Sequence, residues 1–250
     1  DIFDVKNDKI NKPHKTYVSV SISIRIAWIL YWLHSLLGLG LAMYISIKKG
    51  LPEFMLLFLF GHACLFFYSK YFQKKILIGN IVIAFICGAL IYLTYLFDFR
   101  IDANRLSLNL DKEGLTKVTF RISEIKFYMV FSFLGTLIRE IIKDIEDIDG
   151  DYNAGYITLP IAIGKKRTRN INFVLILLFM VVLILNTGYH YSMNYNVLTV
   201  AMSLICMLCL YMLYKLWMAK TKKHFHFLSN LMKIILLLGI LSMFLFTFEP

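Results

Sequence analysis

Charge is scarce in this sequence, because Asp, Glu, Lys and Arg together make up only 17% of its 250 residues. Soluble domains carry about 25% charged residues and about 45–50% apolar residues, whereas 59% of this chain is hydrophobic. The four cysteines all lie in apolar stretches, where they behave as small hydrophobic residues. The composition excludes a water-soluble domain, a disordered chain and a disulfide scaffold, and indicates an integral membrane protein of helical type.

Acidic residues are the scarcer sign of charge, with 16 Asp and Glu against 27 Lys and Arg. In a soluble protein, the resulting net charge of +11 would suggest a nucleic-acid partner. In a membrane protein, such an excess is typical of cytoplasmic loops and of contacts with anionic headgroups. We therefore expect membrane lipids as partners and no nucleic acid.

Seven stretches are long and apolar enough to cross a hydrocarbon core of about 30 Å as helices. They span residues 22–47, 51–68, 76–97, 125–142, 171–190, 195–218 and 231–248. Residues 98–124 are polar and predict one long extramembrane loop. The sequence therefore predicts an all-α, polytopic transmembrane helical bundle that forms a single membrane domain over residues 1–250.

The basic residues predict the orientation of this bundle. If the N-terminal segment lies in the cytoplasm, the loops on that side carry twice as many Lys and Arg residues as the opposite loops. Cytoplasmic loops of membrane proteins are enriched in these residues. We expect a multi-pass protein of the cell membrane, with the N-terminal segment and residues 143–170 on the cytoplasmic side.

Nine of the 16 acidic residues lie in two short segments, residues 1–8 and 140–151. Each segment contains three aspartates with the spacing D-x-x-D-x-x-x-D. They are Asp1, Asp4 and Asp8 in the first and Asp144, Asp147 and Asp151 in the second. On an α-helix this spacing places three carboxylates within an arc of about 60°. We expect each cluster to present its carboxylates on one helical face, on the same side of the membrane.

Three carboxylates on one face repel each other unless a cation neutralises them. Oxygen ligands favour Mg²⁺, which shares its coordination sphere with water and with phosphate oxygens. The two clusters therefore predict a site for Mg²⁺ ions around a diphosphate, with all six aspartates as metal ligands. The alternative is that these residues are solvated helix ends that pair with nearby lysines.

The first cluster resembles the first motif of the UbiA family of intramembrane prenyltransferases, N-D-x-x-D-x-x-x-D followed by x-x-N-K-P. Residues 1–13, D-I-F-D-V-K-N-D-K-I-N-K-P, match this motif from its first Asp onward. The family's fold has nine transmembrane helices, with this motif at the cytoplasmic end of the second. The resemblance implies two further helices and an Asn before Asp1, so that the complete protein would have nine helices.

The second cluster is similar to the second motif of the same family. Residues 139–151 read R-E-I-I-K-D-I-E-D-I-D-G-D, a form closest to members that attach geranylgeranyl to geranylgeranylglyceryl phosphate. The resemblance implies a prenyltransferase in which Mg²⁺ held by the six aspartates stabilises the leaving diphosphate.

The resemblance also implies roles in substrate binding. Lys12, Lys15 and Lys143 lie near the aspartates and are expected to hydrogen-bond the diphosphate. Lys75 and Asn80 are expected to line the acceptor pocket, and a helix–helix hydrogen bond is an equal alternative for Asn80.

Two other groups of polar residues receive no defined role. Arg139 and Glu140 either pair with other residues of the bundle or position the second cluster and a phosphate. His224 and His226 are expected in a basic loop and are assigned no metal or catalytic role.

The predicted function is Mg²⁺-dependent transfer of a polyprenyl group, geranylgeranyl, from its diphosphate to a lipid-like acceptor, geranylgeranylglyceryl phosphate. One alternative is an aromatic acceptor, as in quinone biosynthesis. An alternative from a different class is a membrane transporter or cation channel with acidic helix ends. A channel requires acidic residues along a pore at membrane depth, whereas these lie at helix ends on one side.

Overall fold

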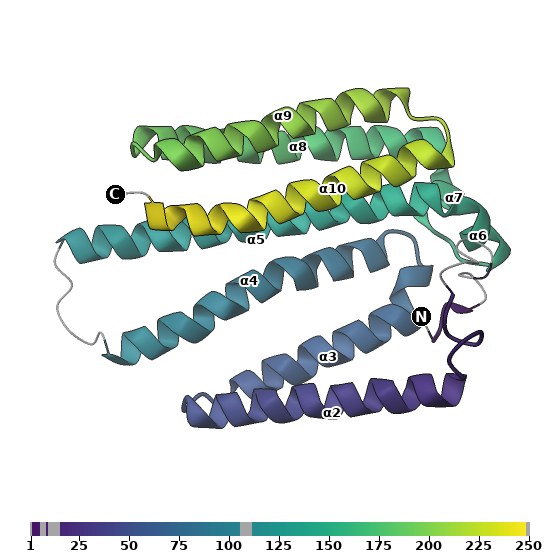
Figure 1. The fold of residues 1–250 in the computed structure, drawn as a ribbon, viewed down its shortest axis with the longest axis horizontal. Helices are drawn as coiled ribbons and strands as arrows, with labels where there is room; N and C mark the ends of the chain where they lie inside the picture. The colour runs from purple at the N-terminus through teal and green to yellow at the C-terminus, as the bar shows by residue number, and fades with distance from the viewer. Residues whose placement is uncertain (1, 6–8, 10–15, 106–111, 249–250) are drawn as a thin grey trace. The chain divides into compact units, whose positions relative to one another are not determined.

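A computed structural model describes residues 2–5, 9, 16–105 and 112–248 (Figure 1). Every regular element in these ranges is a helix, which confirms the predicted all-α fold. The long helices are α2 (Ile24–Lys48), α3 (Phe54–Lys70), α4 (Ile78–Arg105), α5 (Lys112–Glu146), α8 (Lys165–Ser192), α9 (Asn196–Met218) and α10 (Lys222–Ser242). The short elements are η2 (Phe72–Lys74), α6 (Ile148–Asn153), α7 (Leu159–Ile163) and η3 (Met243–Phe248).

Within the described ranges, six helical segments are long and apolar enough to cross a membrane. They are Ile24–Lys48, Phe54–Lys74, Ile78–Leu96, Lys165–Ser192, Asn196–Met218 and Lys222–Phe248. The fourth predicted stretch, 125–142, is helical as part of α5 but holds three charged residues and is not among the six. Its charged residues are Lys126, Arg139 and Glu140.

The long extramembrane loop predicted over residues 98–124 is wrong in its extent. Helix α4 continues to Arg105 and α5 begins at Lys112, so most of that segment is helical. Hydropathy predicts where the chain leaves the apolar part of the membrane. It does not predict where a helix ends, because polar residues also form helices. Residues 106–111 lie outside the described ranges.

Contacts within the chain divide it into two compact units. The first unit comprises Asp1–Val82 and Asp147–Ala162, and the second comprises Ile83–Glu146 and Ile163–Pro250. In the first unit, α2 and α3 lie side by side (Figure 1). Most of their large apolar side chains are exposed, as expected of helices that face lipid. The single domain over residues 1–250 stays a prediction.

Helices α5, α8, α9 and α10 form the core of the second unit. Fully buried side chains from these helices include Ile138, Phe179, Met212 and Phe225, respectively. Helices α5 and α10 run side by side in opposite directions (Figure 1). The two helices approach closely at Gly239, where a Cβ atom would overlap the ring of Phe131.

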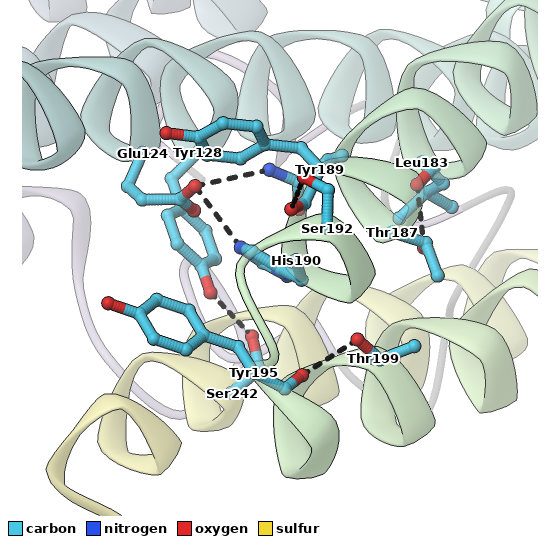
Figure 2. A network of polar contacts seen from close by, with 11 residues as sticks. Glu124, Tyr128, Leu183, Thr187, Tyr189, His190, Ser192, Tyr195, Thr199 and Ser242 are labelled. Carbon is cyan, nitrogen blue, oxygen red and sulfur yellow. Dashed lines mark hydrogen bonds and ion pairs between the residues drawn. The ribbon is translucent and has the colours of Figure 1, made fainter. Parts of the chain in front are cut away.

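A buried polar network ties α5 to α8 and α10 in this unit (Figure 2). The Oε1 atom of Glu124 lies 3.1 Å from Nε2 of His190 and accepts a hydrogen bond from Nδ2 of Asn186 at 3.4 Å. The Tyr128 hydroxyl and the Ser242 Oγ atom, 2.8 Å apart, connect α5 to α10. Glu124 lies 20 residues before Asp144, a helical distance of about 30 Å, so the network is far along α5 from the second motif.

Candidate active site

Three segments of the first unit meet at the carboxylate of Asp4. Asp4 lies in the turn before Val5, Gln73 lies in η2, and Tyr156 lies between α6 and α7. Gln73 donates a hydrogen bond from Nε2 to the Oδ2 atom of Asp4, and the Tyr156 hydroxyl donates to Oδ1 at 2.9 Å. These bonds orient the carboxylate and leave each oxygen further lone-pair capacity for a cation.

The segment that follows the second motif is tied to η2 at the same place. The Tyr156 amide donates to the carbonyl of Asp151 at 2.9 Å, and the Ile157 amide donates to the carbonyl of Lys74 at 3.1 Å. The Lys74 Nζ atom lies 5.2 Å from the centroid of the Tyr156 ring. Tyr156 therefore links the two motifs, with its hydroxyl on Asp4 and its amide on Asp151.

The second motif does not form the single helical face expected of its three aspartates. Asp144 lies on α5, which ends at Glu146, and Asp151 lies on α6, which begins at Ile148. Asp147 separates the two helices with φ −96° and ψ 9°, at the edge of the helical region. The helix is interrupted at Asp147, so the spacing rule for a continuous helix does not apply here. The side chains of Asp147 and Asp151 are buried, with 7% and 6% exposure, respectively.

The donor chemistry of this site suits Mg²⁺, although the described residues do not form a complete ligand cage. The described aspartates of the two motifs are Asp4, Asp144, Asp147 and Asp151, and all offer carboxylate oxygens. Within the described ranges, no three His, Cys, Asp or Glu side chains gather closely enough to hold a metal ion. Asp1 and Asp8 lie outside those ranges. Metal ligation by the six aspartates stays a prediction.

The predicted substrate-binding residues fall in different places. Asn80 lies in the first turn of α4 and is buried, whereas Lys75 lies between η2 and α4 and is exposed. Lys143 is half-buried near the C-terminal end of α5. Lys12 and Lys15 lie outside the described residues. The roles of all five stay predictions.

Sequence reasoning did not identify Gln73 and Tyr156, the two side chains that hold Asp4. These residues are 69 and 152 positions from Asp4 in the sequence, so only the tertiary fold brings them together. The sequence did offer one indication, because both residues lie close to segments that carry predicted site residues. Gln73 precedes the Lys74–Lys75 pair, and Tyr156 follows the second motif by five residues.

The expected basic loop around His224 and His226 is wrong, because both residues lie in the first turns of α10. The Nδ1 atom of His226 lies 2.8 Å from Oε1 of Glu146, in the second motif. Glu146 is buried, with 7% exposure, while His226 is half exposed. A histidine without an assigned role therefore contacts the acidic motif directly.

The family model described as the UbiA prenyltransferase family matches residues 1–237. The chain is also similar to a solved structure concerned with digeranylgeranylglyceryl phosphate synthase in membranes. That likeness has a TM-score of 0.60 and 26% sequence identity, and covers 97% of this chain and 76% of the other.

Curated relatives include proteins named digeranylgeranylglyceryl phosphate synthase. The protein of Pyrococcus abyssi is 31% identical over 173 residues, which are 69% of this chain and 53% of that protein. The protein of Methanosphaera stadtmanae is 27% identical over 242 residues, 97% of this chain and 79% of that protein. For the Pyrococcus abyssi protein and the one from Methanococcus aeolicus, the match spans about half of the relative's length, 53% and 50%.

Proposed function

The chain belongs to the UbiA prenyltransferase family, and from this premise we propose that it transfers geranylgeranyl from its diphosphate to geranylgeranylglyceryl phosphate. The observation that carries the proposal is the link between the two aspartate motifs, in which Tyr156 donates from its hydroxyl to the Asp4 carboxylate and from its amide to the backbone carbonyl of Asp151. Family membership favours this enzyme over the transporter or channel alternative. The relatives' names support the glyceryl phosphate acceptor.

In the proposed reaction, the bond between C1 of the prenyl chain and the diphosphate oxygen breaks, and pyrophosphate leaves. A bond forms between C1 and a hydroxyl oxygen of the acceptor, and the hydroxyl proton is released. Mg²⁺ held by Asp1, Asp4, Asp8, Asp144, Asp147 and Asp151 would supply Lewis-acid stabilisation of the leaving group. Since charge develops on the leaving oxygen, this stabilisation is stronger in the transition state than in the ground state.

The chain's own side chains prepare this site. Gln73 and Tyr156 fix the orientation of Asp4, so its carboxylate does not reorganise when charge develops. Lys12, Lys15 and Lys143 are proposed to donate charge-assisted hydrogen bonds to the diphosphate. The apolar helices around the prenyl chain exclude water, which would otherwise capture the allylic cation.

We also propose that the site faces the cytoplasm of a multi-pass cell-membrane protein. The twofold excess of basic residues on the loops of the motif side supports this orientation. Anionic lipid headgroups on that side are the expected surroundings of these loops.

The acceptor is tested by competition. When geranylgeranylglyceryl phosphate and 4-hydroxybenzoate are offered together with geranylgeranyl diphosphate, we expect the glyceryl phosphate to carry nearly all of the transferred prenyl group. The reason is that Arg139, Lys143 and the I-E-D core of the second motif favour an acceptor that itself carries a phosphate. Mass spectrometry of the products gives the ratio. Prenylation of the aromatic compound alone would replace this proposal with the quinone-type reaction.

A second prediction concerns Gly79, which packs against the backbone of Gln73. In Gly79→Ala, the new Cβ atom would lie 2.7 Å from both the Gln73 Cα atom and the Phe72 carbonyl oxygen, so η2 must move. We expect prenyl transfer to fall about tenfold or more, because Asp4 loses a fixed partner. The control is Gly38→Ala in α2, where a Cβ atom meets nothing within 4 Å. Equal rates for both variants would show that η2 does not position Asp4.

A further inference from the structure

Two rows of polar side chains lie along the paired helices α5 and α10. Arg139, Lys143 and Glu146 are spaced four and three residues apart on α5, and His226, Asn230 and Lys233 have the same spacing on α10. Residues at these spacings share one face of a helix. The two rows are called here the α5 row and the α10 row.

The two rows lie side by side because one member of each makes contact. Glu146 meets His226 at 2.8 Å, and further along the same helices Phe131 faces Gly239, which fixes an antiparallel register. Arg139 lies seven residues before Glu146 on α5, and Lys233 lies seven residues after His226 on α10. Both steps are about 10 Å, so Arg139 and Lys233 lie at the same level of the helix pair.

The α10 row is a continuous chain of hydrogen bonds. The Lys233 Nζ atom donates to Oδ1 of Asn230 at 3.2 Å, and Nδ2 of Asn230 lies 3.1 Å from Nε2 of His226. The chain ends at Glu146, two residues from Asp144. The direction of Lys233 agrees with the tendency of helical side chains to point toward the N-terminus. The row therefore aims the ammonium group toward the end of the bundle that carries the second motif.

Lys233 is unusual because it lies within the apolar segment Lys222–Phe248. A charge at membrane depth is costly and indicates a function unless an acidic partner neutralises it. Among the described residues, its polar contact is the neutral amide of Asn230. Arg139 pairs with Glu140, but its Nε atom is buried and has no partner in the described part of the chain. Among the described residues, Lys233 thus contacts no carboxylate, and Arg139 keeps one hydrogen-bond donor without a partner.

We infer that Arg139 and Lys233 hold the phosphate of the acceptor, and that Asn230 and His226 are positioning residues for Lys233. This inference rests on the proposed function, in which the acceptor carries a phosphate and the donor diphosphate lies at the aspartates. A phosphate monoester accepts several charge-assisted hydrogen bonds, which the two cations supply. On α5, Lys143 lies between Arg139 and Asp144. The acceptor is thereby held through its phosphate, and its hydroxyl, one short glyceryl spacer away, is free to approach the donor.

The test uses the full chain in lipid nanodiscs and compares Lys233→Gln, Lys233→Arg and the control Lys223→Gln. Lys223 is an exposed lysine in the first turn of the same helix, ten residues and about 15 Å from Lys233. We expect Lys233→Gln to weaken binding of geranylgeranylglyceryl phosphate about tenfold and to raise its KM similarly. Binding of the dephosphorylated lipid and the KM for geranylgeranyl diphosphate should not change. Lys233→Arg should restore most of the affinity, and the control should match the parent.

The outcomes separate the inference from the proposed function. Unchanged acceptor affinity in Lys233→Gln would overturn the inference even if the parent transfers geranylgeranyl normally. Phosphatidic acid that competes as well as the acceptor would also overturn it, since Lys233 would then bind lipid headgroups in general. A parent that binds the phosphorylated acceptor through Lys233 but forms no product would support the phosphate site and contradict the proposed function.

Discussion

Replacement of Asp147 or Asp151 by Asn is expected to abolish prenyl transfer while leaving the protein folded in the membrane. Asn retains nearly the same volume but lacks the negative charge that a Mg²⁺ ligand supplies. Loss of the stabilisation of a leaving diphosphate by about 4 kcal/mol would slow the reaction about a thousandfold. The measurement is the rate of pyrophosphate release from geranylgeranyl diphosphate in the presence of acceptor. Chelation with EDTA should abolish the parent's activity, and added Mg²⁺ should restore it.

The matched control for these variants is Asp149→Asn. Asp149 lies on α6 between the two residues, but it is exposed whereas they are buried. The same change of charge at this position should lower the rate by less than about threefold, because an exposed carboxylate near other charges is screened by water. Activity of Asp147→Asn and Asp151→Asn within a few-fold of the parent would contradict metal ligation. An equally large loss of rate in Asp149→Asn would show that the rate depends on the total negative charge of the segment and not on individual metal ligands.

The helices of this chain were predictable because their apolar stretches are long, whereas their ends were not. Helix α8 illustrates the limit, since the apolar pattern begins at residue 171 but the helix begins at Lys165. The glycine before it, Gly164, has φ +88° and marks the start. The six intervening residues are polar and helical, and hydropathy gives no signal for a solvated first turn.

The candidate site was predictable only in its acidic part. The repeated aspartate spacing identified the two motifs without any structure, but it assumed an unbroken helix over residues 144–151. A spacing rule carries no information on where a helix is interrupted, so it did not predict the break at Asp147. The contacts of Gln73, Tyr156 and His226 likewise join segments far apart in the sequence. A single sequence gives the chemistry of such groups but not which of them meet.

The Glu124 network is a structural element on which a large stability effect is expected. The Oε1 atom of Glu124 accepts a hydrogen bond from Asn186 and lies 3.1 Å from Nε2 of His190, and all three side chains are at most 8% exposed (Figure 2). Glu124→Ala removes the shared acceptor and leaves two buried polar groups without it. Buried polar groups left unpaired cost about 1–3 kcal/mol each. We expect the free energy of unfolding to fall by about 3 kcal/mol, measured by thermal denaturation in detergent micelles.

A double replacement distinguishes loss of pairing from loss of volume. In Glu124→Leu with His190→Leu, both polar groups of that contact become apolar, so we expect about half of the lost stability to return, since Asn186 still lacks its acceptor. The control is His224→Ala, at an exposed position in the first turn of α10. Since Glu124 lies about 30 Å along α5 from Asp144, residual folded protein should keep the parent's KM for the donor. A changed KM together with unchanged stability would mean that the network belongs to the substrate site and is not a structural tie between α5 and α8.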